Sequence, residues 1–274
     1  MWTDRSACCR LEGEEDTLKA GPPLSQYPDL GDRVYYLLRE QILTAKLPPG
    51  SLLLGVELAR DLGVSRTPVA DALNLLASEG LVEVVPRKGY FVTTLDIQAY
   101  LDLMDARLAI EMAAAERGIA KASEAQRAAL RQQHAKVSEF SADSERPLDY
   151  PEWAGRDARF HELLVETSGN PYLMEAYGRL SARAQLAYIR FSLSAGIRPV
   201  ADSVGEHEAI LAAFLAGDLA ALQVAITTHV DRLRQFHAAR SQAIAARPLA
   251  QQQPAARVSK RLHWPGRNRP AEGY

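Results

Sequence analysis

The spacing of apolar positions divides this chain into a short mixed segment and a long helical one. In residues 31–45 the apolar side chains recur every three or four positions, which is the period of one helix face. A second, shorter stripe ends at Gly63, and a third starts after Ser65; glycine is typical of helix C-termini and serine of helix N-caps. The pattern therefore predicts three helices before residue 80.

Two short runs of apolar residues follow, Leu81 to Val85 and Tyr90 to Thr94. They flank Pro86-Arg87-Lys88-Gly89, whose proline and glycine favour a tight turn, so we expect a β-hairpin. A close pair of helices followed by a hairpin is typical of a winged helix-turn-helix, in which the second helix of the pair enters the DNA major groove.

From about residue 96 to 243 the pattern is helical throughout and shows no strand signals. The fold class is therefore mainly α, with a winged helix-turn-helix of three helices and a β-hairpin over 31–95, followed by an all-α helical bundle over 96–243. Residues 1–30 and 244–274 lack periodicity, and we predict a disordered N-terminal extension and a disordered basic tail. The predicted helices of the bundle span 96–121, 123–142, 150–168, 171–195, 200–216 and 218–243.

The formal net charge of −2 does not favour DNA binding, and the seven basic residues of 31–95 are balanced by seven acidic ones. Affinity for DNA must then depend on where single cations lie. The predicted recognition helix starts with Arg66, and the hairpin tip, where a wing meets phosphate, carries Arg87 and Lys88. The candidate DNA-binding residues are Arg33, Ser65, Arg66, Thr67, Arg87, Lys88 and Gly89.

The helical segment carries a second group of polar residues. Asp157 and His161 lie four apart and so share a helix face, while His207 and His229 each lie within an apolar stripe of the last two helices. Three neutral imidazoles and a carboxylate inside a bundle suit a divalent metal ion, zinc first, with nickel and manganese as alternatives. By spacing alone, hydrogen-bonded core histidines are the more common explanation of the same pattern, and both interpretations stay open.

The N-terminal segment contains four motifs in order: Leu47-Pro48-Pro49-Gly50-Ser51, Glu57-Leu58-Ala59, the run from Leu62 to Val69, and the run from Pro86 to Val92. With these motifs the segment resembles the GntR family of bacterial regulators, whose members bind operator DNA as dimers. The resemblance implies that this protein forms a homodimer on double-stranded operator DNA.

The chain departs from that family pattern at several positions. Ala70, Asp71 and Asn74 stand where the family usually has an arginine, a glutamate and a basic residue. The polar residues usual before the second helix are replaced by Leu54-Gly55-Val56. Fewer cationic contacts predict weaker and less salt-dependent DNA binding.

The helical segment contains a second set of motifs: Asp157-Ala158-Arg159-Phe160-His161, Ser168-Gly169-Asn170-Pro171, Glu206-His207-Glu208-Ala209-Ile210 and Thr228-His229-Val230. With these motifs it resembles the ligand-binding C-terminal domain of the FadR subfamily of these regulators. In many members an aspartate and three histidines bind a metal ion, which contacts a carboxylate effector. The resemblance thus implies that Asp157, His161, His207 and His229 are metal ligands.

The same resemblance implies an effector-binding arginine on the first helix of the bundle. Arg107 occupies that position, and a guanidinium inside a bundle needs an anion such as a carboxylate, which it binds through two parallel hydrogen bonds. The alternative is an intrahelical ion pair with Glu111, four residues further on. Asn170 and Arg183 are further candidates for the effector pocket.

We therefore expect a DNA-binding transcription regulator, not an enzyme, whose operator binding responds to a small carboxylate effector. The alternatives are a metal-dependent hydrolase, for which no acid-base group is evident, and a helical interaction module that has lost DNA binding. The N-terminal residues lack an apolar signal segment, and no apolar run approaches the ~18 residues of a membrane span. We expect a cytoplasmic protein without a membrane partner.

Overall fold

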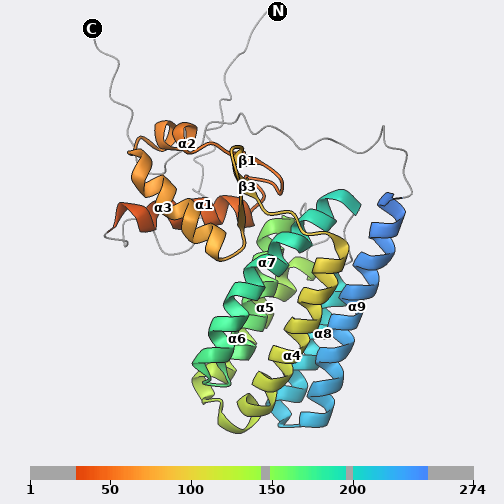
Figure 1. Cartoon of the computed structure of the whole chain (residues 1–274). Coiled ribbons are helices and arrows are strands. Elements are labelled where there is room, and N and C mark those ends of the chain that lie inside the picture. Colours follow the sequence, from red (N-terminus) through yellow and green to blue (C-terminus); the bar gives the residue numbers. More distant parts are fainter. Residues whose placement is uncertain (1–28, 143–148, 196–199, 246–274) are drawn as a thin grey trace, which may run out of the picture.

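The computed structural model describes residues 29–142, 149–195 and 200–245, which form a helical bundle with a smaller mixed domain at one end (Figure 1). The predicted fold class, a winged helix-turn-helix followed by an all-α bundle, is confirmed. Nearly all of the predicted N-terminal extension and basic tail lie outside the described residues. No helix of the described part is long and apolar enough to cross a membrane.

The small domain is built on the packing of its first helix against its third. Apolar faces of both helices are fully buried, with Leu38 on one and Leu73 on the other. Its sheet has the strand order β1-β3-β2, antiparallel throughout. The sequence analysis did not predict β1, because two residues are too short to show an alternating pattern. The elements are α1 (Leu30–Leu43), β1 (Leu52–Leu53), α2 (Gly55–Leu62), α3 (Arg66–Ser78), β2 (Val82–Val85) and β3 (Gly89–Val92).

The turn between α2 and α3 has the predicted length and one unpredicted feature. Gly63 ends α2 in the left-handed conformation with φ 65°, as expected of a glycine at a helix C-terminus. Ser65 occupies the N-cap position of α3, but its side chain makes no capping hydrogen bond, so that part of the prediction was wrong. Its exposed side chain is therefore not used to cap the helix.

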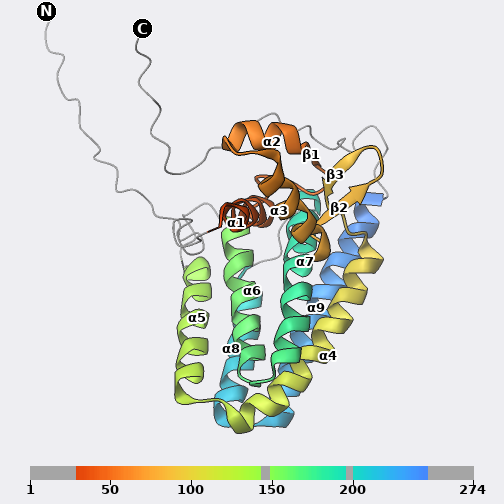
Figure 2. The same ribbon diagram turned by 60° about the vertical axis from the view of Figure 1, so that its left-hand side comes forward.

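Long helices running side by side make up the bundle (Figure 2). Their bounds agree with the predicted ones within a few residues. The apolar stripes meet in two main clusters, one around Tyr100 and Met104, the other around Phe160 and Phe214. The helices are α4 (Ile97–Lys121), α5 (Glu124–Ala142), α6 (Tyr150–Glu166), α7 (Pro171–Ala195), α8 (Val200–Ala216) and α9 (Leu219–Ala245).

The two domains share part of one hydrophobic core. Ala182 and Leu186 of α7 are buried in the cluster formed by α1, α2, α3 and the sheet. Helix α1 packs against α7 at this contact. The small domain is thus joined to the bundle by packing as well as by the chain between β3 and α4.

We predict that Gly118→Ala destabilises the protein although alanine favours helices. A Cβ at Gly118 of α4 would lie 2.0 Å from Thr167 Oγ1, which is itself bonded to the Leu164 carbonyl at 2.6 Å. Forced repacking at such a contact costs about 1–3 kcal/mol of unfolding free energy. Denaturant unfolding measures this effect.

Gly178→Ala in α7 is the matched control, because it is exposed and a Cβ there would meet nothing within 4 Å. It should stabilise the protein by up to ~1 kcal/mol through helix propensity alone. Equal stabilisation by both substitutions would contradict the close approach at Gly118.

Candidate functional site

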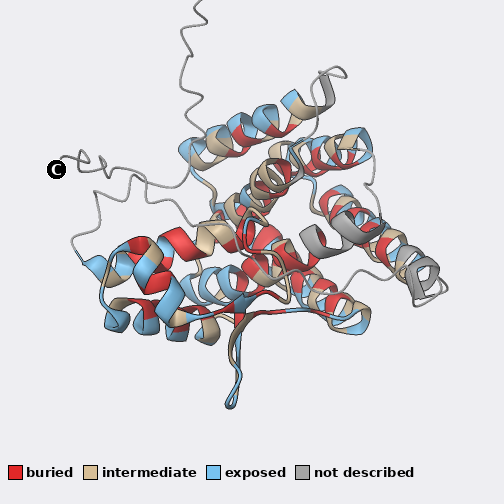
Figure 3. Ribbon diagram, turned by 90° about the horizontal axis from the view of Figure 1, so that it is seen from above, coloured by how far each residue is buried: buried red, intermediate tan, exposed pale blue. Residues whose placement is uncertain are grey.

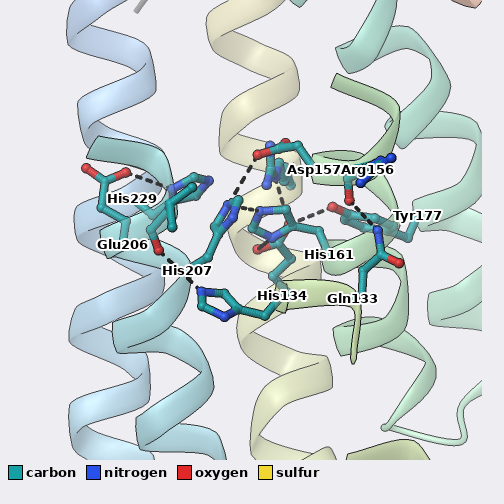
Figure 4. Close-up of polar contacts among 12 residues, drawn as sticks. Gln133, His134, Arg156, Asp157, His161, Tyr177, Glu206, His207 and His229 are labelled. Carbon is teal, nitrogen blue, oxygen red and sulfur yellow. Dashed lines mark hydrogen bonds and ion pairs between the residues drawn. The ribbon is translucent and has the colours of Figure 1, made fainter. Parts of the chain in front are cut away.

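Three buried histidines converge inside the bundle (Figure 4). His161 comes from α6, His207 from α8 and His229 from α9, and one ring nitrogen of each lies within 4.8 Å of the others. Nε2 of His207 lies 3.1 Å from Nε2 of His161 and 3.2 Å from Oδ1 of Asp157. The structure therefore brings together all four residues that the sequence analysis assigned to a metal ion.

Two buried glutamates orient the histidine rings. Glu206 Oε2 lies 2.9 Å from His229 Nδ1, and Glu111 Oε2 lies 3.2 Å from His161 Nδ1. Because an ionised carboxylate only accepts, each Nδ1 carries the proton and each Nε2 keeps a free lone pair. The sequence analysis missed Glu206, although an acidic residue next to His207 in a mostly apolar helix was a signal for it.

Burial keeps these imidazoles neutral. It lowers the pKa of His229 to about 4, and burial together with the neighbouring His229 and His161 rings lowers the pKa of His207 well below its usual value. Burial, with the charge of Arg107, also lowers the pKa of His161. The neutral form is the one that binds metal, so at neutral pH these rings are ready to act as ligands.

The donor set could hold a divalent ion. Nδ1 of His207 and Nε2 of His229 are buried and have no hydrogen-bond partner among the described residues. Each unpaired buried polar atom lowers the free energy of unfolding by about 1–3 kcal/mol. A metal ion bound to Nε2 of His229 would remove this cost for that atom. Two ligand atoms on one tetrahedral zinc ion lie about 3.4 Å apart. The separations of 3.1 and 3.2 Å around His207 are close to that value.

Glu111 links the histidine cluster to a buried arginine. Its Oε1 accepts hydrogen bonds from Arg107 Nε at 2.7 Å and from the Tyr177 hydroxyl at 2.6 Å. Burial acts to raise the pKa of Glu111, but the Arg107 guanidinium and the bonds from His161 and Tyr177 hold it well below its usual value. The intrahelical Arg107–Glu111 pair, the alternative considered in the sequence analysis, therefore forms. Nη2 of Arg107 still has no hydrogen-bond partner among the described residues and is buried.

A cavity lined by residues of α4, α6, α7 and α9 adjoins this network. Arg107 and Asp157 both line it, so it borders the buried cation and the histidine cluster at once. A small anion bound here would lie beside the guanidinium and several groups that donate hydrogen bonds. The other polar lining residues are Tyr100, Tyr177, Ser181, Gln185 and Tyr188.

The two further effector candidates do not line this cavity. Asn170 precedes α7, where its Oδ1 accepts a hydrogen bond from the Tyr172 backbone N–H at 3.1 Å. Arg183 lies against the small domain, since its Cδ is 3.0 Å from where a Cβ on Gly80 would be.

The predicted DNA-contact residues of α3 lie together at the exposed start of that helix. Ser65, Arg66 and Thr67 are exposed, while Val69, further along the same helix, is fully buried. This is the surface that a recognition helix presents to the major groove. Arg33 on α1 is half-buried.

The hairpin of β2 and β3 projects from the body of the protein (Figure 3). Arg87 and Lys88 are exposed at its tip, just before Gly89, the first residue of β3. Arg87 has a φ of 64°, and this left-handed conformation costs a residue with a Cβ roughly 1–2 kcal/mol. A strained, exposed cation at the tip of a wing is the kind of residue that contacts a ligand.

Asn74 has a role that the sequence analysis did not anticipate. Its Oδ1 accepts a hydrogen bond of 2.8 Å from the Tyr90 hydroxyl, which connects α3 to β3. The residue that replaces a basic one in the family pattern thus ties the recognition helix to the wing.

Comparisons with known proteins match both domains. Residues 30–92 match the model for bacterial regulatory proteins of the gntR family, and residues 102–232 match the FCD domain. An uncharacterised HTH-type transcriptional regulator of Streptomyces ambofaciens is 33% identical over 72% of this chain and 80% of its own length. The HTH-type transcriptional repressor GlaR of Escherichia coli is 29% identical over 72% of this chain and 90% of its own length.

Solved structures show the same fold. The Escherichia coli protein McbR/YncC superposes with a TM-score of 0.66 at 20% identity, covering 78% of this chain and 99% of its own. A GntR regulator from Rhodococcus gives 0.67 at 19% identity, covering 76% and 97%.

These matches decide between the function classes left open by the sequence. The family and its named members are transcription regulators and not enzymes, so the hydrolase alternative is not supported. The chain belongs to the GntR family of DNA-binding transcription regulators, and its helical bundle is an FCD domain.

Proposed function

We propose that this regulator binds a small carboxylate effector at a divalent metal ion in its FCD domain, and that the effector alters operator binding. The observation that carries the proposal is a single buried network. It joins Glu111 to His161 and His207 on one side and to an arginine on the wall of a cavity on the other, and the neutral ring of His229 stacks on His161.

The negative charge of a carboxylate effector requires compensating positive charge inside the bundle. An apolar bundle excludes an anion unless cations inside it offset the loss of hydration. Asp157, His161, His207 and His229 would hold the ion, which supplies positive charge and open coordination positions for carboxylate oxygens. Arg107, with its buried Nη2, would donate to the same carboxylate. Zinc suits three imidazoles and one carboxylate, and nickel and manganese are the alternatives.

We also propose that the protein acts as a homodimer. One recognition helix with Arg66 as its cation reads few base pairs. Two copies related by a two-fold axis would read both halves of an inverted repeat about one helical turn apart.

DNA binding should depend on Arg66 and Arg87. In the Arg66→Ala/Arg87→Ala variant we expect operator affinity to fall by about 1–3 kcal/mol, the value of one base-contacting arginine, or more. The probe is a duplex selected from a random library by the wild-type protein, and the homodimer proposal expects an inverted repeat in it.

Arg131→Ala is the matched control, because Arg131 is an exposed cation of α5 in the bundle. It should bind the selected duplex as the wild type does. Wild-type affinity in the double variant would refute the assignment of these two residues.

Metal uptake should require the histidine cluster. We expect the wild type to purify with bound zinc and His207→Ala/His229→Ala to lack it, since two of four ligands are gone. Elemental analysis of the purified proteins measures this. His134→Ala is the control, because His134 is only partly buried and its Nε2 faces the Val204 carbonyl at 3.4 Å. Equal metal content in the wild type and the double variant would exclude the site.

Glu206 should set metal affinity without being a ligand. Glu206→Gln removes the negative charge that holds the Nδ1 proton of His229, and loss of such a partner weakens metal binding about 10–100-fold. Competition with a chromogenic chelator measures the zinc dissociation constant. Glu208→Gln, an exposed position on the same helix, should leave it unchanged. If both variants weaken zinc binding equally, the loss comes from the reduced negative charge of the helix, and the proposed role of Glu206 in orienting the His229 ring is wrong.

A further inference from the structure

One helix of the bundle contributes side chains to both functional regions. Tyr177, Ser181 and Gln185 of α7 line the cavity beside Arg107. Ala182 and Leu186 of the same helix are buried in the hydrophobic core of the winged helix-turn-helix. We infer that α7 transmits the state of the metal and effector site to the DNA-binding domain, an inference that rests on the function proposed above.

The sensing end of α7 is Tyr177. Its hydroxyl donates to Glu111 Oε1 at 2.6 Å, and the same oxygen accepts from Arg107 Nε at 2.7 Å. The other oxygen of Glu111 faces His161. A metal ion on His161 changes the hydrogen bond between His161 and Glu111, and an anion on Arg107 changes the one between Arg107 and Glu111. Either change alters the position of the Glu111 carboxylate and therefore its hydrogen bond with Tyr177. Binding at the site therefore acts on α7 through a direct hydrogen bond.

The DNA-binding end of α7 lies two turns further along the helix. Leu186 is fully buried in the core that also holds Leu73 and Leu76 of α3. Arg183 covers Gly80, which stands at the turn between α3 and β2 with a φ of 74°. The contact is thus made at the joint between the recognition helix and the wing, where a small displacement changes the position of both.

The alternative route is α4, which follows the wing directly in the chain. Within the described residues, no side chain of α4 belongs to the core of the winged helix-turn-helix. Leu95, Tyr100 and Met104, at the start of this route, pack instead in the cluster of the bundle. A covalent connection without shared packing allows the domain to move, whereas a shared core makes it move with α7.

The mechanism needs two arrangements of α7 with different affinities for the ligand. A ligand shifts such an equilibrium only as far as it binds one arrangement better than the other. Helix α7 is suited to carry the shift, because its hydrogen-bonded backbone couples Tyr177 to Leu186 over nine residues.

Hydrogen–deuterium exchange of the full chain, with and without zinc, tests this inference. Zinc alone is the probe, and calorimetry measures its binding to each variant. In the wild type we expect zinc to change deuterium uptake both around His207 and His229 and in residues 66–85 of the DNA-binding domain. In Arg183→Ala/Leu186→Ala the change around the histidines should remain, and the change in 66–85 should be lost.

Two further variants complete the test. Arg179→Ala is the matched control, because Arg179 is an exposed arginine of the same helix whose partner is Glu175. It should respond as the wild type does. Tyr177→Phe removes one hydroxyl and keeps the buried ring. It should bind zinc and lose most of the change in 66–85, which keeps the inference testable if the double variant does not fold.

The outcomes separate this inference from the proposed function. Zinc binding with a wild-type response of 66–85 in both the double variant and Tyr177→Phe would overturn the role of α7 and favour α4. Zinc binding to the wild type without any change in 66–85 would overturn it as well. Failure of the wild type to bind zinc would refute the metal site itself, and with it the premise of this inference.

Discussion

A fully buried carboxylate sets the arrangement of the helices around it. Glu111 lies inside the bundle, where a charge is tolerated only if donors surround it. Arg107 supplies one from α4, Tyr177 one from α7, and His161 one from α6. Loss of any donor would leave a buried group incompletely paired, so three helices are held in one relative position. The place of the histidine cluster and the orientation of α7 both follow from this constraint.

Aromatic and acidic side chains surround the cluster. The ring of Phe160 stacks on His207 with centroids 4.7 Å apart and helps to bury it. Carboxylates face the ring nitrogens: Glu111 faces Nδ1 of His161, Glu206 faces Nδ1 of His229, and Asp157 faces Nε2 of His207. Glu206 in turn accepts from Arg232, whose side chain is 58% exposed. The orienting carboxylate of His229 is therefore stabilised from the protein surface, whereas that of His161 is stabilised entirely from within.

The DNA-binding domain depends on the positions of a few cationic side chains. Its charge is balanced, yet Arg66 and Arg87 lie exposed at the helix start and the wing tip. The Tyr90–Asn74 hydrogen bond holds these two elements together at 2.8 Å. A domain with few cations benefits from such rigidity, because pre-ordered groups lose less entropy on binding.

The sequence by itself determined the helices, the hairpin and the family, because periodicity, glycine stops and turn residues are local properties of the chain. It also determined that Asp157 and His161 share a helix face, since four residues make about one turn. That His207 and His229 lie close to Asp157 and His161 was implied only by the family resemblance. The distance between residues on different helices depends on how the helices pack. The Arg107–Glu111 pair was an alternative that spacing alone suggested, but only tertiary structure decided that Glu111 also meets Tyr177 and His161. It also decided which domain each face of α7 contacts. The periodicity of apolar residues predicts which face of a helix is buried, but not which element packs against that face.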